Sequence, residues 1–185
     1  MHLEWIKIDG GTCAYGDTGR PVRIPTLWWT RTPLTHGHLS SEQPGIGLRY
    51  PVTEISHAEA TQIAGRFGGR LPRSAEWEWM AAGPGRRPWP WGTTPWQPAF
   101  ANLRDSLHDT VTPVDTHPAG ATPEGMLDVA GNVWEWTAST TMNDGFLIRG
   151  GSYASPSLYA QCTFLNAAPA ELRSRGIGMR VVREL

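Results

Sequence analysis

The sequence has a single lysine, two cysteines and no long apolar run, and each shortage excludes a class of protein. Lys7 is the only lysine and the formal net charge is −1, so the electrostatic footprint of a nucleic-acid-binding domain is missing. No apolar stretch approaches the roughly 20 residues that a transmembrane helix needs, so we expect no membrane insertion. The first residues lack the basic and apolar regions of a secretory signal, which makes a cytoplasmic location the default expectation.

Two cysteines, Cys13 and Cys162, are too few for a disulfide framework. We expect two free, mostly buried thiols in a reducing compartment. Cys162 could instead be a nucleophile, but a reactive thiolate needs a base or a positive environment that lowers its pKa. The neighbouring Gln161 and Thr163 supply neither, so a buried structural thiol is the favoured interpretation.

Glycine, proline and tryptophan are abundant, with 21, 16 and 10 residues in a chain of 185. Glycine and proline form turns and irregular backbone, and large indoles bury much area per residue in a loop-rich fold. This length suits one domain. We therefore expect a single domain over residues 1–185 with little repetitive secondary structure.

Alternating apolar residues predict short strands at both ends of the chain. Residues 5–8 alternate and precede a glycine turn. Residues 22–29 form a second candidate, which Pro25 interrupts, so an edge strand or a bend is expected there. Segments 146–153 and 177–183 alternate well enough to predict two paired strands.

Two helices are predicted in the first half of the chain. The first covers 57–67, with Ser56 as its N-cap and Glu59 as the partner in a capping box. The second covers 75–82, and Ser74 is its expected N-cap.

Two long segments, 31–50 and 84–125, are expected to be loops. In an extended segment His36 and His38 would share one face. With Glu42 nearby, a two-histidine, one-carboxylate metal site can be drawn. A polar surface loop explains the same residues and is the favoured interpretation.

Several unusual strings occur in a fixed order along the chain: Gly69-Arg-Leu-Pro-Arg-Ser-Ala-Glu-Trp-Glu-Trp79, Gly131-Asn-Val-Trp-Glu-Trp136, Arg149-Gly-Gly-Ser152 and Gly178-Met-Arg-Val-Val182. With these strings the chain resembles the formylglycine-generating-enzyme family, also called the sulfatase-modifying-factor family. The resemblance implies an α+β, C-type-lectin-like fold with two helices, short antiparallel strands and much irregular loop. It also implies that bound cations and packed indoles hold the long loops.

Asp128, Gly131, Val133 and Glu135 form a candidate calcium cage. Two carboxylates and two backbone carbonyls within eight residues suit a hard, oxygen-preferring ion, and the resemblance places a structural calcium on these four positions. The alternative is that both carboxylates bind amides of the loop.

A second family cation site would use Asn102 and the carbonyl of Leu103. Its remaining carboxylate belongs to a loop that is shortened here, and Asp109 is the candidate that the sequence offers.

Formylglycine-generating enzymes bind copper through two cysteines that follow the Arg-Gly-Gly-Ser string. The corresponding positions here are Ser155 and Ala160. Copper(I) prefers soft thiolate ligands, which a hydroxyl or methyl group cannot replace. Cys162 could reach the second position only after a two-residue slip, and the first would still lack sulfur. We therefore expect no copper and no formylglycine-generating oxidase activity.

The stretch 153–176 is the expected ligand-facing surface of this fold. Its candidate binding residues are Tyr153, Ser155, Ser157, Leu158, Tyr159, Leu165, Asn166, Leu172 and Arg173. Small residues with scattered tyrosines suit adaptable binding to a protein or other macromolecular ligand. Arg149 and Arg180 are expected to bond to backbone carbonyls beneath this surface.

The same stretch resembles the diversified segment of variable proteins from diversity-generating retroelements. All but Gln161 and Glu171 are residue types that adenine mutation of Asn-type codons yields. Scarcity of lysine and the needs of a loop explain the composition equally. Two other interpretations stay open: a divergent oxidoreductase or tailoring enzyme of the family, and a regulatory paralogue that binds sulfatase-like peptides. Iron-dependent sulfoxide synthases of this fold take histidine ligands from an additional helical domain, for which 185 residues leave no room.

Overall fold

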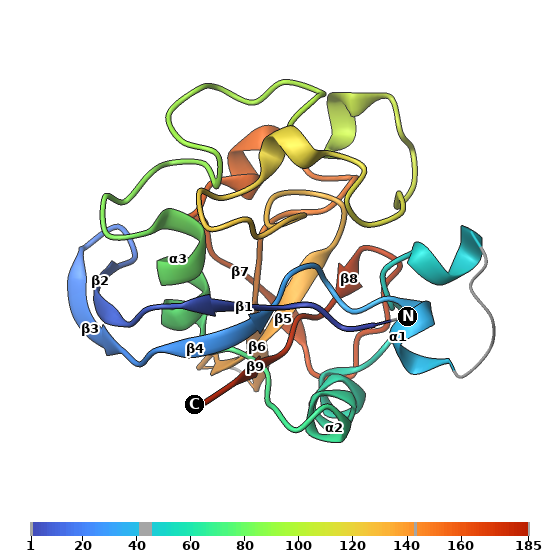
Figure 1. Ribbon diagram of the computed structural model, residues 1–185, viewed down its shortest axis with the longest axis horizontal. Coiled ribbons are helices and arrows are strands. Elements are labelled where there is room, and N and C mark those ends of the chain that lie inside the picture. Colours follow the sequence, from blue (N-terminus) through green and yellow to red (C-terminus); the bar gives the residue numbers. More distant parts are fainter. Residues whose placement is uncertain (1, 41–45, 143, 185) are drawn as a thin grey trace.

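The computed structural model describes residues 2–40, 46–142 and 144–184, in which short helices and strands alternate with long loops (Figure 1). The class is α+β, as the sequence predicts. The strands are β1 (Trp5–Ile8), β2 (Gly11–Tyr15), β3 (Arg20–Ile24), β4 (Leu27–Thr30), β5 (Trp134–Thr140), β6 (Gly145–Arg149), β7 (Asn166–Pro169), β8 (Ile177–Gly178) and β9 (Val182–Arg183). The α-helices are α1 (His36–Leu39), α2 (His57–Arg66) and α3 (Ser74–Ala82). Single 3₁₀ turns are η1 (Ile46–Arg49), η2 (Arg104–Ser106), η3 (Pro118–Gly120) and η4 (Ser157–Ala160).

Within the described residues the strands form three small sheets, rather than the simple strand pairs of the sequence prediction. Their orders are β1-β4-β9, β2-β3 and β7-β6-β5-β8. Segment 22–29 was predicted as one interrupted strand, but it divides at Pro25 into β3 and β4, which belong to different sheets. Proline lacks the backbone donor that would continue the ladder.

Segments 146–153 and 177–183 do not pair with each other, contrary to the prediction. Strand β5 lies between them, antiparallel to β6 and parallel to β8. Its first four residues are all buried. Strand β5 therefore has a partner along each of its two edges and is an interior strand of its sheet.

Helix α2 forms as its capping signals predict. The Ser56 backbone donates to the Glu59 carboxylate at 2.8 Å, and the Ser56 hydroxyl accepts from the Glu59 amide at 3.3 Å. Gly68 follows the helix with a φ of +69°, a conformation that glycine adopts without strain. The buried residues Ala60, Ile63 and Ala64 pack into the core beneath β5 and β6.

Helix α3 starts one residue earlier than predicted. Arg73 is the N-cap, and the Glu76 carboxylate accepts from its amide at 2.7 Å. Ser74, the predicted cap, is instead the first helical residue, and its hydroxyl accepts from the Tyr15 hydroxyl at 2.9 Å. Glu76 at the third helical position therefore caps the helix from inside.

The predicted loop 31–50 contains the short helix α1. His38 Nδ1 accepts from the Thr35 amide at 3.0 Å, which turns this ring toward the helix start. His36 is exposed, so the two imidazoles do not share the face of an extended segment. Glu42 lies outside the described residues.

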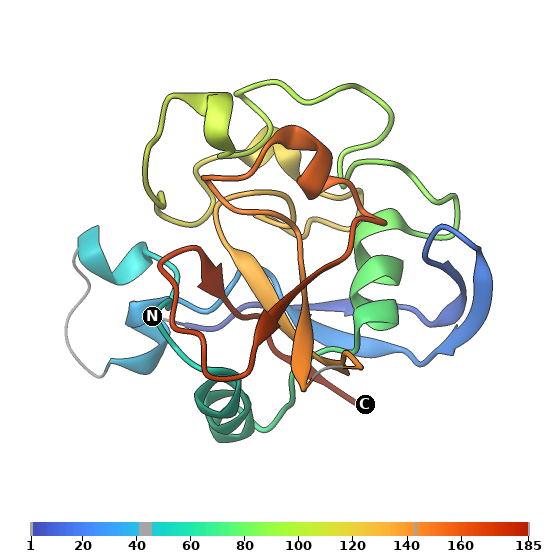
Figure 2. The same cartoon turned by 180° about the vertical axis from the view of Figure 1, so that it is seen from behind.

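Helix α2 lies on one side of the four-stranded β7-β6-β5-β8 sheet. The irregular segment 84–125 lies with η4 on the opposite side (Figures 1 and 2). Trp136 is fully buried in the core cluster that includes α2, and Trp29 and Trp77 are fully buried in a second cluster that includes α3. Within the described ranges, no helix is long and apolar enough to cross a bilayer.

Candidate functional site

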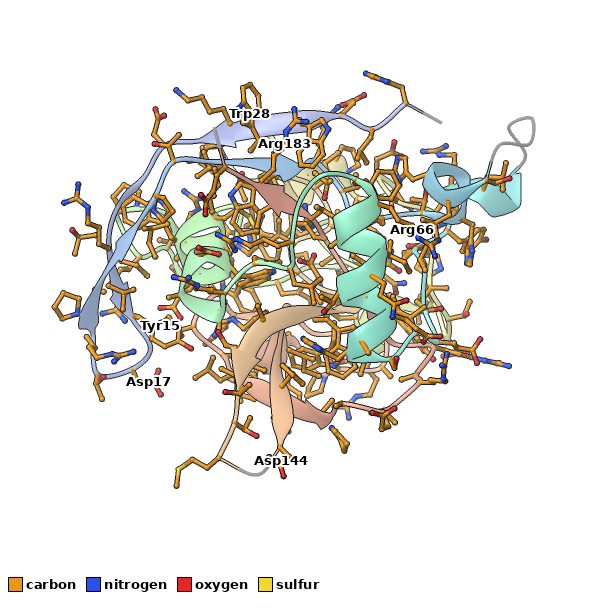
Figure 3. All side chains as sticks on the ribbon, turned by 90° about the horizontal axis from the view of Figure 1, so that it is seen from below. Tyr15, Asp17, Trp28, Arg66, Asp144 and Arg183 are labelled. Carbon is orange, nitrogen blue, oxygen red and sulfur yellow. The ribbon has the colours of Figure 1, made fainter. Side chains whose placement is uncertain are left out.

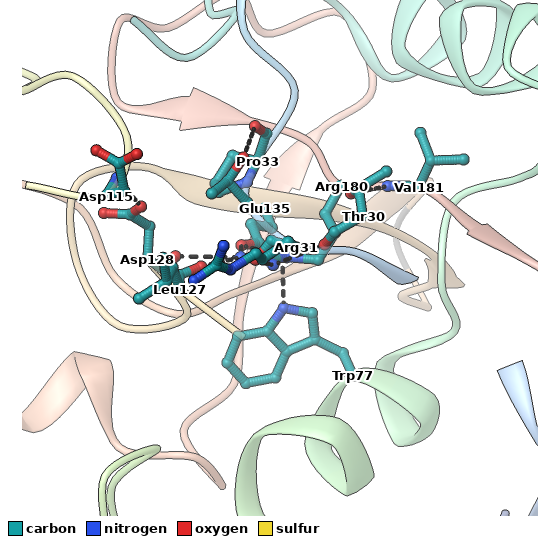
Figure 4. Close-up of polar contacts among 11 residues, drawn as sticks. Thr30, Arg31, Pro33, Trp77, Asp115, Leu127, Asp128, Glu135, Arg180 and Val181 are labelled. Atoms are coloured by element: carbon teal, nitrogen blue, oxygen red, sulfur yellow. Dashed lines mark hydrogen bonds and ion pairs between the residues drawn. The ribbon is translucent and has the colours of Figure 1, made fainter. Parts of the chain in front are cut away.

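A fully buried ion pair joins β5 to the segment that precedes β9 (Figure 4). Glu135 from β5 and Arg180, which precedes β9, are each 0% exposed and meet at 2.8 Å. The second oxygen of Glu135 accepts from the indole N–H of Trp77 at 2.8 Å. Arg180 also donates to four backbone carbonyls, those of Thr30, Arg31, Leu127 and Asp128. The expected backbone contacts of Arg180 are therefore present, with a carboxylate added.

A second buried pair lies over the face of the Trp77 ring, whereas Glu135 meets the N–H at its edge. The Arg149 guanidinium carbon is 5.0 Å from the centroid of this indole, and Arg149 Nη2 donates to Glu78 at 2.9 Å. The same nitrogen donates to the Cys162 carbonyl at 2.6 Å. Trp77 is thus enclosed by two ion pairs, and β5, β6 and α3 are fixed together.

Positions 155 and 160, which the resemblance assigns to copper, are both in the interior. Ser155 is 5% exposed, and its hydroxyl accepts from the Ser152 amide at 3.0 Å. Ala160 is 0% exposed. Ser155 therefore does not belong to the exposed surface on which the sequence placed it, because the turn after Gly151 directs its hydroxyl back to Ser152. Neither position carries sulfur.

Both thiols are buried and hold their protons. Burial raises the pKa of Cys162 to about 12. Burial, followed by the charge of Glu78, raises the pKa of Cys13 to about 11. Two free, buried cysteines are what the sequence predicts, and a nucleophilic thiolate is disfavoured at either one.

The first candidate calcium cage contains one available carboxylate and one that is already paired. Asp128 is 8% exposed, accepts from the Asp115 amide at 2.7 Å, and has its pKa raised to about 6, chiefly by burial. Such a buried carboxylate fits a cation ligand. Both oxygens of Glu135 accept from Arg180 or Trp77, so the charge of Glu135 is already neutralised.

The second candidate cation site is arranged around a hydroxyl group. Ser106 Oγ lies 2.9 Å from Asn102 Oδ1 and 2.6 Å from the Leu103 carbonyl. The two expected ligand oxygens are thus together, but a cation would have to displace Ser106. Asp109 is exposed. Among the described residues, no three His, Cys, Asp or Glu side chains form a cluster suited to a metal.

The first part of the 153–176 surface is an exposed apolar patch on an aromatic base. Leu158 and Leu165 are 56% and 40% exposed, and with Phe164 they line a hollow of about 320 Å³. The half-buried Tyr159 stacks on Phe164, with ring centroids 4.4 Å apart. Trp134 supports both rings from the core. Tyr153 and Ser157 are half-buried.

The second part of the surface surrounds strand β7. Asn166 is exposed, and its side chain accepts from the Ala167 amide at 2.9 Å. Leu172 is 41% exposed. Arg173 pairs with Glu59 at the start of α2 at 2.7 Å, so this predicted binding residue is held by the scaffold.

A separate hollow of about 670 Å³ lies beside β7. Asp17 lines the Leu158 hollow and Asp144 the β7 hollow, each near the turn of a different hairpin (Figure 3). The surface therefore has two parts, each with a carboxylate at its rim.

Some residues that shape the site were not identified from the sequence. Glu78 could have been suspected from the Glu-Trp-Glu string, whose two glutamates each meet a different arginine. Ser106 follows Asn102 by four residues, a spacing at which a hydroxyl can reach back in a turn. No local signal identifies Glu135 as the partner of Arg180.

Comparison with known proteins agrees with this architecture. The sulfatase-modifying factor enzyme 1-like domain family matches residues 4–185. The chain belongs to this family. It is 37% identical over 124 residues to the hercynine oxygenase of Mycobacterium tuberculosis, covering 64% of this chain and 28% of that protein. It is 33% identical over 145 residues to the inactive C-alpha-formylglycine-generating enzyme 2 of Bos taurus, covering 69% of this chain and 47% of that protein.

The chain therefore spans less than half the length of these family relatives. Among solved structures, variable protein 1 of Treponema denticola superposes with a TM-score of 0.78 at 16% identity, over 98% of this chain and 95% of that one. At this identity the likeness shows a shared fold.

Proposed function

We propose that this family member is a binding domain without the copper chemistry of formylglycine-generating enzymes, and that its ligand is a protein or other macromolecule. The absence of sulfur at Ser155 and Ala160 carries the proposal. Both positions are buried, so an external thiol would not readily complete a copper site there. Cys13 and Cys162 are protonated and lie in the interior. Copper(I) would find no pair of thiolates.

The proposed contact surface consists of Leu158 and Leu165 on the base formed by Tyr159, Phe164 and Trp134. Exposed leucines next to a hollow are typical of interaction sites. The stacked rings below them are held by the core, so little conformational freedom is lost on binding. The fold shared with a protein named as variable supports a recognition role.

We further propose that calcium stabilises the scaffold at Asp128, with the carbonyls of Gly131 and Val133 and with Glu135 as the fourth position. A bound cation would neutralise the Asp128 carboxylate, which burial otherwise keeps partly protonated. Glu135 would bind the calcium ion only while it kept its ion pair with Arg180. A second ion at Asn102 and Leu103 would require the Ser106 hydroxyl to turn away.

Competition with a chelator for copper(I) tests whether the chain lacks a copper-binding site. The wild-type chain should not remove copper(I) from a chromophoric chelator, whereas S155C/A160C, which restores both sulfurs, should bind one equivalent. The variant C13A/C162A controls for the native thiols. Stoichiometric copper(I) binding that persists in C13A/C162A would overturn the proposal.

Selection from a displayed random-peptide library tests the binding surface. Peptides that bind the wild-type chain should lose at least about tenfold in affinity, or 1.4 kcal/mol, for L158D/L165D. They should bind L39D unchanged, because Leu39 is a similarly exposed leucine (40%) on α1. Equal loss for both variants, or no loss for the first, would contradict the assignment.

A retroelement origin is a finer proposal about the same segment. It requires a near-copy of the codons for 149–182 beside a reverse-transcriptase gene. Sequencing the genomic neighbourhood decides it, and the absence of such a copy would exclude it.

The second candidate function is a divergent oxidoreductase or tailoring enzyme, favoured by the 37% identity to a hercynine oxygenase. Iron titration with oxygen-electrode recording separates the two functions. Stoichiometric iron with oxygen consumption would favour the enzyme, whereas calcium binding without oxygen consumption would favour the binding domain.

A further inference from the structure

Two histidines approach each other in the irregular segment on the side of the molecule opposite α2. His108 follows η2, and His117 immediately precedes η3. The intervening loop is fixed to the core at its centre, where the amide of Thr112 donates to Asn132 Oδ1 at 2.8 Å and the Asn132 side chain donates back to the Thr112 carbonyl at 3.0 Å. The two imidazoles are therefore brought together by an ordered loop.

The rings are close and steeply inclined to each other. Their centroids are 6.1 Å apart, with an interplanar angle of 71°. Imidazole nitrogens lie about 2.0–2.1 Å from a bound zinc ion, so two rings that share one tetrahedral ion have centroids about 5.2 Å apart. The observed separation is longer, so one ring must move toward the other before both can bind the same ion.

One ring is already prepared as an acceptor. His117 Nε2 is buried and has no hydrogen-bond partner among the described residues. In the neutral tautomer that carries its proton on Nδ1, this nitrogen offers a free lone pair, which is the form in which histidine binds a metal.

The surroundings of His117 also favour the neutral form of its ring. Burial, and then the neighbouring His108, lowers the pKa of His117 below its ordinary value. A neutral imidazole binds metal, whereas the protonated form does not. His108 is exposed, so its ring can rotate toward the shared position without disturbing the core.

We propose that His108 and His117 bind one borderline divalent transition-metal ion, such as zinc. Imidazole ligands select this class of ion over calcium. Because no third His, Cys, Asp or Glu joins them within the described part of the chain, water completes the coordination and the ion stays exchangeable.

The ion would cross-link the two ends of the 109–116 loop. That loop includes Asp115, whose amide supports Asp128 and whose carboxylate pairs with Arg49. The proposed site is separate from the oxygen ligands at Asn102 and Leu103, which meet at Ser106 rather than at the histidines.

Isothermal titration of the full chain with zinc chloride, after chelator treatment, tests the proposal. One equivalent should bind, and H108Q and H117Q should each weaken binding by at least about tenfold, since each removes one of two side-chain ligands. H36Q, which removes an exposed imidazole on α1, should change the affinity less than about twofold. A tenfold molar excess of calcium over zinc should not compete, because imidazole prefers zinc.

Imidazole NMR of the wild-type chain gives a readout that does not depend on folding of a variant. Substoichiometric nickel(II) should broaden the resonances of His108 and His117 before those of His36 and His57. The proposal fails if zinc binding does not saturate, if H36Q weakens it as much as H108Q, or if other histidines broaden first.

Discussion

The buried centre and the exposed 153–176 segment of this protein are built on opposite principles. At the centre, Glu135, Arg180 and Trp77 are fully buried and all their polar groups meet partners from distant parts of the chain. In the segment, Leu158 and Leu165 face solvent over a stacked aromatic base. The centre holds the strands and helices together, while the segment presents the surface that we propose as the contact site.

This difference shows why fold and chemistry can separate within one family. The strings that reveal the family supply both ion pairs and the Trp77 indole that contacts each of them, and these fix α3, β5 and β6. Positions 155 and 160, which the resemblance assigns to copper, take no part in that network. Ser155 and Ala160 can therefore replace the copper cysteines, with hydroxyl and methyl groups packed in the interior, while the scaffold is kept.

The largest effect is expected from breaking the central ion pair. Arg180→Met leaves Glu135 charged, buried and without its guanidinium, which should lower the free energy of unfolding by about 3–5 kcal/mol. Urea denaturation measures the loss. Arg173→Met removes an exposed pair with Glu59 and should leave the midpoint unchanged. Equal effects of the two substitutions would contradict the contrast between the regions.

The next prediction concerns Asp128, whose substitution should raise the free energy of unfolding rather than lower it. Its pKa is raised to about 6 in the folded chain from an ordinary value of 3.8, so the unfolded chain loses this proton first and stability falls as pH rises from about 4 to 6. At pH 7 the ionised group costs up to about 3 kcal/mol. In the presence of EGTA, Asp128→Asn should therefore stabilise the protein at pH 7, and the gain should vanish below about pH 4.

Calcium should reverse the order of stability of the wild-type chain and Asp128→Asn at pH 7. It should stabilise the wild-type chain at pH 7 and leave Asp128→Asn unchanged, as recorded by thermal unfolding with and without the ion. If both proteins respond equally to calcium, Asp128 is not a ligand. If the metal-free proteins unfold identically at pH 7, the carboxylate is not destabilising.

A smaller effect is expected at the boundary of the two regions. Tyr159→Ala removes the stack on Phe164 and part of the support for Leu158, and the stack alone is worth about 0.5–1.5 kcal/mol. Chemical denaturation should show a loss of at least that size, and selected peptides should bind more weakly. Unchanged stability would mean that the aromatic base does not hold the surface.

The smallest effect is expected from the exposed leucines. L158D/L165D should change the free energy of unfolding by less than about 0.5 kcal/mol per site while it weakens peptide binding by at least about tenfold. Denaturation and binding are measured on the same preparations. A large loss of stability would show that this segment belongs to the scaffold, and the distinction between the regions would disappear.

Local signals in the sequence predicted what neighbouring residues determine. The Ser56 and Glu59 capping pair defined the start of α2, because both partners lie within one turn. The pairing of Glu135 with Arg180 joins residues 45 positions apart, which no spacing rule encodes. Ser155 was placed on the surface because its position also depends on a distant contact, the Arg104 amide that donates to the Ser155 carbonyl at 3.1 Å.

Oxygen consumption tests the central claim most directly. The wild-type chain, loaded with copper and given a cysteine-containing peptide in air, should consume no oxygen beyond the copper-only background. Catalytic turnover of the thiol with copper at unit occupancy, retained when Cys13 and Cys162 are replaced by alanine, would contradict the account.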